Sequence, residues 1–187
     1  MNPMKNFNAY GETGAVVTDN RQLYEKLISL RYAGTLNKEN CHYPSLNGRI
    51  DTIQAAMLLV NLNYLEDKIK KRRKIAQCYS KELEKTVVCP QVDEGAFHTY
   101  YSYTITTPKR DKLKEFLLEK GIETKIQHPI LMPYHNAYCS ILPKYKLPVA
   151  ERLVDQILCI PNHEKMDFEE VEYVVKYIKE FFGNLKK

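Results

Sequence analysis

Residues 51–85 contain neither glycine nor proline, so nothing in this stretch breaks a helix. Asp51 suits the N-cap, and Gln54 three residues later offers the reciprocal bond of a capping box. Apolar side chains then recur at helical spacing, at Ile53, Ala56, Met57, Val60 and Tyr64. At 1.5 Å per residue the helix would be roughly 50 Å long. We therefore predict a connecting helix over 51–86, a length typical of a link between two bodies of a larger protein.

The predicted helix carries a basic run, Lys68 to Lys74. Such a run either binds phosphate or forms a solvated helix face, and the sequence favours the solvated face. The formal net charge of +5 is common in ordinary soluble domains, and the lysines are spread along the chain. We therefore expect no nucleic-acid partner.

Residues 87–187 alternate between strand and helix patterns, which predicts a small α/β layer domain with helices on one face of its sheet. The Tyr- and Thr-rich segment suits a strand, Gly121 suits a helix end, and Asp167 with Glu170 forms a second capping box. The expected order is a strand at 99–106, a helix at 111–120, a strand at 123–127, an irregular loop at 128–138, a helix from Pro148 through Ile157, a strand at 158–161 and a helix from Asp167 to Phe182, before Gly183.

Residues 1–50 supply too few elements for a complete sheet. A short strand is expected at 15–18, a helix at 22–30 and a structured loop, rich in turn formers, at 31–49. A lone strand needs neighbours that this segment does not provide. We therefore predict that residues 1–50 are the remnant of a larger domain and that the chain is truncated.

Composition limits the other function classes. The chain has 187 residues, of which 44% are hydrophobic, enough for about one domain with its own core. No apolar run is long enough to span a bilayer and no secretory signal is present, so we expect a cytoplasmic protein with no membrane partner. The five cysteines include no CxxC pair, and no two of the five histidines have the HExxH spacing. We expect neither a disulfide framework nor a metal site.

The segment 2–18 is the strongest chemical signal. Lys5 precedes a turn-rich stretch and a short apolar run, an arrangement that suits a Schiff-base lysine at a sheet edge. The segment resembles the cofactor-lysine region of the DegT/DnrJ/EryC1/StrS family of sugar aminotransferases, which use pyridoxal phosphate (PLP). Further pieces match in order: Asn47-Gly48-Arg49-Ile50-Asp51 with Gln54-Ala55-Ala56, His128-Pro129, Asn136-Ala137-Tyr138 and Val149-Ala150-Glu151-Arg152-Leu153.

This resemblance implies the C-terminal part of a fold-type-I PLP-dependent transferase: the end of the large domain, the long connecting helix and the small α/β domain. It implies that Lys5 binds PLP and carries the proton during transamination. A lone lysine near a terminus is otherwise a solvated residue. Some relatives that act as sugar dehydratases have histidine at this position, so lysine favours aminotransfer.

The resemblance also implies roles for residues farther along the chain. Asn47 matches an asparagine that reaches the cofactor phosphate across a dimer interface, and it also suits a turn before Gly48. Arg49 suits a phosphate or carboxylate, or a local pair with Asp51. For the nucleotide-sugar substrate the candidates are Tyr10, His128 and His135, each of which has an equally good packing or loop role.

Several cofactor contacts of the family belong to its first half and have no counterpart in this sequence, so we expect this chain alone to be a weak or inactive catalyst. The expected activity of the complete enzyme is transfer of an amino group from glutamate to a nucleotide-linked keto sugar for polysaccharide or glycan synthesis. The expected partner is a second copy or a chain that supplies the first half. The alternative is a non-catalytic module that acts by pairing with another chain.

Overall fold

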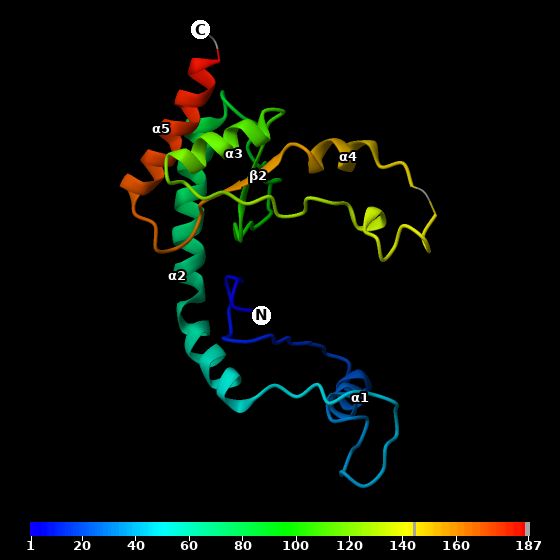
Figure 1. Ribbon diagram of the computed structural model, residues 1–187. Coiled ribbons are helices and arrows are strands. Elements are labelled where there is room, and N and C mark those ends of the chain that lie inside the picture. Colours follow the sequence, from blue (N-terminus) through cyan, green and yellow to red (C-terminus); the bar gives the residue numbers. More distant parts are fainter. Residues whose placement is uncertain (144, 186–187) are drawn as a thin grey trace. The chain divides into compact units, whose positions relative to one another are not determined.

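Helix α2, Thr52–Leu83, is the longest element of the computed structural model, which describes residues 1–143 and 145–185 (Figure 1). Its 32 residues confirm the predicted long helix. The chain divides within α2 into two compact units, Met1–Glu66 and Asp67–Lys187, and each is described by itself.

The first unit contains α1, Arg21–Arg31, and the start of α2. Asn20 caps α1 by accepting a hydrogen bond from the Leu23 N–H, and the helix agrees with the prediction. The strand predicted at 15–18 is wrong: the structure assigns none there, and Val16 and Val17 are exposed. A strand exists only with a partner, and the described residues of this unit offer none.

The loop between α1 and α2 is held by turns and two isolated antiparallel bridges, Tyr32 to Asn47 and Thr35 to Cys41. Gly34 has φ +73°, and a Cβ placed on it would lie 1.7 Å from the Tyr43 backbone oxygen. Only glycine fits this close approach of two backbone segments. The predicted structured loop is therefore confirmed, and its shape depends on one glycine.

The second unit is built on a two-stranded antiparallel sheet, β1 (Tyr103–Thr106) with β2 (Ile157–Ile160). Tyr103 lies opposite Ile160, and Thr106 lies opposite Ile157. Single bridges extend the sheet on both sides, Val88 to Thr106 and Lys125 to Cys159. The strand predicted at 123–127 is thus reduced to one bridge, and the strand predicted from residue 99 begins at Tyr103.

The helices of this unit follow the predicted order. They are α3 (Arg110–Glu119), the short 3-10 turn η1 (Met132–Tyr134), α4 (Pro148–Val154) and α5 (Phe168–Asn184). Helix α4 ends before Ile157, which belongs to β2. The capping box of Asp167 and Glu170 is present at α5. Helix α5 continues through Gly183 rather than ending before it, because glycine weakens a helix without forbidding it.

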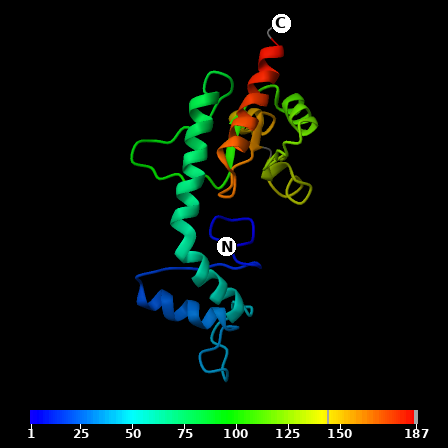
Figure 2. The same cartoon turned by 90° about the vertical axis from the view of Figure 1, so that its left-hand side faces the viewer.

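One face of the sheet is buried under α2, α3 and α5. Along β1 the burial alternates, with Tyr103 and Ile105 inaccessible to solvent. Figures 1 and 2 show α5 beside the C-terminal half of α2, where Lys179 and Glu82 form an ion pair at 2.6 Å. The core also includes apolar side chains from all three helices, among them Ile75, Leu83, Leu113, Leu117, Val171, Val174 and Ile178.

The basic run on α2 only partly forms the solvated face that the sequence favours. The Lys70 side chain is 67% exposed, as expected. Arg72 differs, because its side chain is 11% exposed and pairs with Glu164 at 2.9 Å. Its Nη1 also donates to the backbone oxygens of Tyr101 at 3.1 Å and Asn162 at 2.6 Å. This guanidinium joins α2 to two loops and is a structural group of the second unit.

Candidate active site

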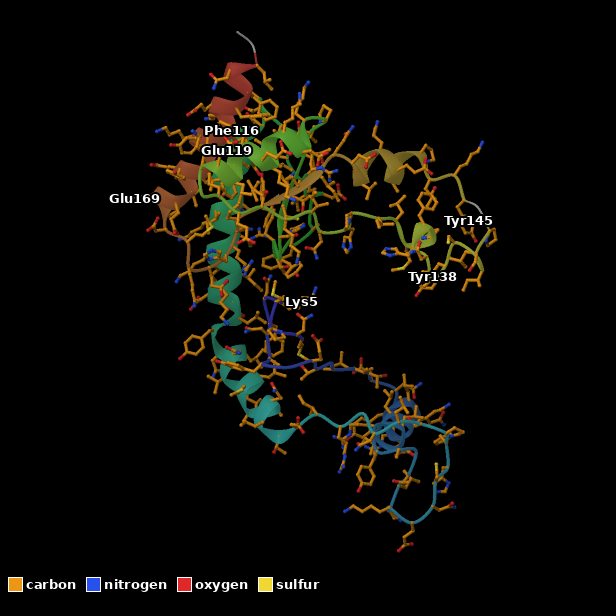
Figure 3. All side chains as sticks on the ribbon, viewed as in Figure 1. Lys5, Phe116, Glu119, Tyr138, Tyr145 and Glu169 are labelled. Atoms are coloured by element: carbon orange, nitrogen blue, oxygen red, sulfur yellow. The ribbon has the colours of Figure 1, made fainter. Side chains whose placement is uncertain are left out.

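Lys5 lies on a tight turn whose backbone is closed by local hydrogen bonds (Figure 3). The Lys5 N–H donates to the Asn2 oxygen at 3.1 Å, and the Asn2 side chain accepts from the Met4 N–H at 3.1 Å. The Ala9 N–H donates to the Met1 oxygen at 3.2 Å. Lys5 is an exposed residue, and its backbone belongs to a folded turn.

Two side chains of α2 tether this turn. The Gln54 Oε1 accepts from the Tyr10 N–H at 2.9 Å, and the Asn61 Nδ2 donates to the Asn8 oxygen at 2.8 Å. Ala9, between the two tethered residues, is fully buried. Because Gln54 and Asn61 are seven residues apart, about two helical turns, they hold the segment along the helix. The position of Lys5 is therefore fixed by α2 as well as by its own turn.

The tether changes the interpretation of Gln54. The sequence predicts that Gln54 completes a capping box with Asp51, whereas the hydrogen bond described for its Oε1 is with Tyr10, 44 residues away. The Tyr10 side chain is 71% exposed, so its ring is accessible and its backbone is held. A ligand role for the Tyr10 hydroxyl stays a prediction.

Asn47 and Arg49 are brought together in the loop before α2. The Arg49 Nε donates to the Asn47 Oδ1 at 3.0 Å, and the guanidinium carbon lies 4.3 Å from the centre of the Tyr32 ring. Tyr32 in turn pairs with Asn47 through a backbone bridge. Within the described residues no ion pair joins Arg49 to Asp51. Arg49 therefore pairs locally with the Asn47 amide rather than with the Asp51 carboxylate.

His128 and His135 belong to the second unit. Both are exposed, and His135 follows η1 directly, with its N–H donating to the Met132 oxygen at 3.3 Å. Figure 3 shows that Tyr138, from the same segment, lies at an exposed end of this unit, as does Tyr145. The irregular loop with a short turn is confirmed, whereas substrate contact by either histidine stays a prediction.

A hydrogen-bonded pair joins that loop to α4. The Tyr134 hydroxyl donates to the Glu151 carboxylate and lies 3.1 Å from the Tyr145 backbone oxygen. The same carboxylate accepts from the Leu147 N–H at 3.1 Å, at the start of α4. The bond to Glu151 raises the pKa of Tyr134, and the bonds from Tyr134 and Leu147 lower the pKa of Glu151. Two segments singled out in the sequence, 128–138 and 149–153, are therefore in direct contact.

Sequence reasoning missed the tethers Gln54 and Asn61 and the platform Tyr32. Each acts on a residue that is distant along the chain, and no local spacing signals such a pair.

Among residues 1–143 and 145–185, no three His, Cys, Asp or Glu side chains are grouped as metal ligands would be. In the same described part of the chain, no helix combines the length and apolar character that crossing a bilayer requires.

The donor groups present fit part of a site for the cofactor that the resemblance implies. Lys5 carries a primary amine and lies on an exposed, hydrogen-bonded turn. Asn47 offers a neutral donor, because its oxygen faces Arg49 and its Nδ2 therefore points away from the guanidinium. A primary amine suits the carbonyl carbon of PLP, and a neutral amide donor suits its phosphate.

Comparison with known proteins gives a consistent result. The sequence profile of the DegT/DnrJ/EryC1/StrS aminotransferase family matches residues 1–179. A "Pleiotropic regulatory protein" of Geobacillus stearothermophilus is 36% identical over 96% of this chain and 50% of its own length. The dTDP-3-amino-3,6-dideoxy-alpha-D-galactopyranose transaminase of Aneurinibacillus thermoaerophilus is 31% identical over 90% of this chain and 46% of its own length.

Solved structures agree. A DegT/DnrJ/EryC1/StrS aminotransferase from Brucella abortus superposes with a TM-score of 0.91 at 31% identity, covering 97% of this chain and 49% of that one. NtdA from Bacillus subtilis, solved with the bound cofactor PMP, superposes with a TM-score of 0.88 at 26% identity, covering 97% of this chain and 44% of that one. The chain spans about half the length of the curated relatives that it matches.

Proposed function

Because the chain belongs to the DegT/DnrJ/EryC1/StrS aminotransferase family, we propose that it forms the C-terminal half of an enzyme that transfers an amino group from glutamate to a nucleotide-linked keto sugar. The chain has the fold of that part of a PLP-dependent transferase. We assign residues 1–50 to the end of the large domain, 51–86 to the connecting helix and 87–187 to the small domain. The cytoplasmic location expected from the sequence belongs to this proposal.

The observation that carries the proposal is the Lys5 turn, which is closed by its own backbone and tethered to α2 by Gln54 and Asn61. When bound, PLP supplies an electron sink for the amino-group transfer. In this proposal the Lys5 Nζ holds the cofactor's carbonyl carbon and moves the proton at the substrate carbon. A fixed backbone beneath a flexible side chain suits both tasks, because the amine must reach two positions.

Asn47 donates its Nδ2 to the phosphate of the cofactor bound by a partner subunit. Tyr10, His128 and His135 contact the nucleotide-sugar substrate. The partner in this proposal is a second copy, or a chain that supplies the first half of the site. We expect this chain alone to be a weak or inactive catalyst, since residues from the first half of the family fold complete the cofactor site.

The second candidate is a non-catalytic module that acts by pairing with another chain. The 36% identical relative named a pleiotropic regulatory protein favours it. The two candidates differ in one chemical requirement. A catalyst needs the Lys5 amine, whereas a pairing module keeps its function when Lys5 is replaced.

The test is labelling of the full chain with PLP, reduction with borohydride and peptide mapping by mass spectrometry. The variants are Lys5→Ala and a matched Lys70→Ala, since Lys70 is another exposed lysine. Selective, saturable label at Lys5 that persists in Lys70→Ala and is absent from Lys5→Ala supports the enzyme.

Label scattered over surface lysines in all three proteins would contradict a cofactor pocket in the chain alone. The decisive second experiment mixes the chain with candidate polypeptides that supply the first half of the site. Restored transamination that depends on Lys5 supports the split enzyme, and a stable complex without transamination supports the module.

A further inference from the structure

We propose that Arg49 is a positioning residue that fixes the orientation of the Asn47 amide, with the Tyr32 ring as its platform. The inference rests on the proposed function, in which Asn47 donates a hydrogen bond to a phosphate. It assigns Arg49 a role that differs from direct contact with the substrate.

The orientation follows from the donors and acceptors at the contact. The Arg49 Nε lies 3.0 Å from the Asn47 Oδ1. A guanidinium has only N–H donors, so the amide oxygen must face it, and the amide Nδ2 must then lie on the other side. An amide without such a partner presents its oxygen or its nitrogen with similar ease. With its oxygen outward, Asn47 would repel a phosphate, because two acceptors would then meet.

The guanidinium is itself held in place. Its central carbon lies 4.3 Å from the centre of the Tyr32 ring, a distance typical of an arginine stacked on an aromatic face. Stacking leaves the in-plane Nε–H free to point along the ring toward Asn47. A lysine ammonium lacks this plane and cannot reproduce the arrangement.

The backbone brings the three side chains into register. Tyr32 and Asn47 form an antiparallel bridge, and the Gly48 N–H donates to the Arg31 oxygen at 3.0 Å. The Ser45 hydroxyl donates to the Leu30 oxygen at 2.8 Å. The loop is therefore tied to the end of α1 by bonds that do not involve the Arg49 side chain. Removing that side chain should free the amide and leave the loop in place.

The experiment uses NMR on the full chain, without cofactor. It measures the heteronuclear NOE of the Asn47 side-chain amide in the wild type and in Arg49→Leu, Arg49→Lys, Tyr32→Leu and Tyr32→Phe. Asn40, an exposed residue of the same loop, is the internal reference. The backbone amides of Gly34 and Gly48 report whether the loop keeps its fold.

We expect an ordered Asn47 amide in the wild type and in Tyr32→Phe, which keeps the ring face. In Arg49→Leu, Arg49→Lys and Tyr32→Leu the NOE should fall to the level of Asn40, while the Gly34 and Gly48 resonances stay in place. An Asn47 amide as mobile as Asn40 in the wild type, or unchanged in Arg49→Leu, would overturn the proposal. Joint loss of Asn47 order and the Gly48 resonance would also overturn it, because Arg49 would then hold the loop rather than the amide.

The NMR measurements on Asn47 do not depend on whether the proposed function is correct. Failure of Lys5 to take the PLP label leaves the NMR result unaffected. Conversely, a mobile Asn47 amide in a chain that labels at Lys5 removes only the role of Arg49. Titration with inorganic phosphate adds a second reading: the Asn47 amide resonances should shift in the wild type, and the shift should be lost in Arg49→Lys.

Discussion

Replacing Arg72 by methionine should destabilise the second unit far more than the same change at Arg73. Methionine keeps an apolar stem along α2 but removes the guanidinium. Three hydrogen bonds and an ion pair are lost: the Arg72 Nε donates to Glu164 at 3.0 Å, its Nη1 donates to two backbone oxygens, and its Nη2 lies 2.9 Å from the Glu164 carboxylate. The Glu164 carboxylate is left in a place where its side chain is only 24% exposed.

The expected cost is about 3 kcal/mol, at the low end of the range for an unpaired buried charge, because water still reaches part of Glu164. In a unit of this size that corresponds to a loss of roughly 10 °C in melting temperature. Arg73 is the matched control. It donates to the His98 oxygen at 2.8 Å, and its guanidinium carbon lies 4.3 Å from the centre of the Phe97 ring. This hydrogen bond is exposed to solvent, whereas those of Arg72 are partly buried, so about 1 kcal/mol or less is expected.

The assay is guanidinium denaturation followed by the near-UV circular dichroism of the tyrosines. Tyr79 and Tyr103 are buried with ring centres 5.2 Å apart, so their signal reports the core of this unit. A double-mutant cycle with Glu164→Gln should give a coupling free energy of about 1–2 kcal/mol between the two side chains. Equal midpoints for Arg72→Met and Arg73→Met would refute the reasoning.

The difference in unfolding free energy between wild type and Arg72→Met should also depend on pH. Burial by itself would raise the pKa of Glu164, but the hydrogen bond from its own backbone N–H and the Arg72 charge outweigh burial and lower the pKa. A lowered folded pKa stabilises the protein above the unfolded value, about 4.3 for Glu, and this stabilisation is lost as the pH falls through the folded value. The gap between wild type and Arg72→Met should therefore narrow below about pH 4.3.

Three further changes test other parts of the chain. Gly34→Ala should lower the unfolding free energy by roughly 2 kcal/mol or more, because its Cβ would lie 1.7 Å from a backbone oxygen. Gly121→Ala has the same φ of +73° but open space around it, so about 1 kcal/mol is expected. Hydrogen exchange of the amides in the 31–49 loop should be faster in Gly34→Ala and unchanged in Gly121→Ala. Asp167→Ala should lower the unfolding free energy by about 1 kcal/mol through loss of the α5 capping box, measured by denaturation, and an unchanged midpoint would contradict that value. Tyr134→Phe should raise the pKa of Glu151 toward its ordinary value, followed by NMR titration of the carboxyl group, and an unchanged titration would show that the Tyr134 hydroxyl does not bind Glu151 in solution.

Elements with local causes could be predicted from the amino-acid sequence. The lack of helix breakers in 51–85 gave α2, and the Asp167 and Glu170 pair gave the start of α5, because helix bonds and caps join residues at most a few positions apart. The order of elements in the second unit followed for the same reason. The resemblance, carried by short motifs around Lys5 and Asn47, identified the family that the whole-chain comparison shows.

Contacts between residues that are far apart in the sequence became known from the folded chain. Strand limits were wrong at 15–18 and 123–127, because a strand is defined by its partner. Gln54 binds Tyr10 and Arg72 binds Glu164, 44 and 92 residues away, and neither partner is near in the sequence. A side chain with several possible partners takes the one that folding brings within about 3 Å, and local spacing carries no record of that choice.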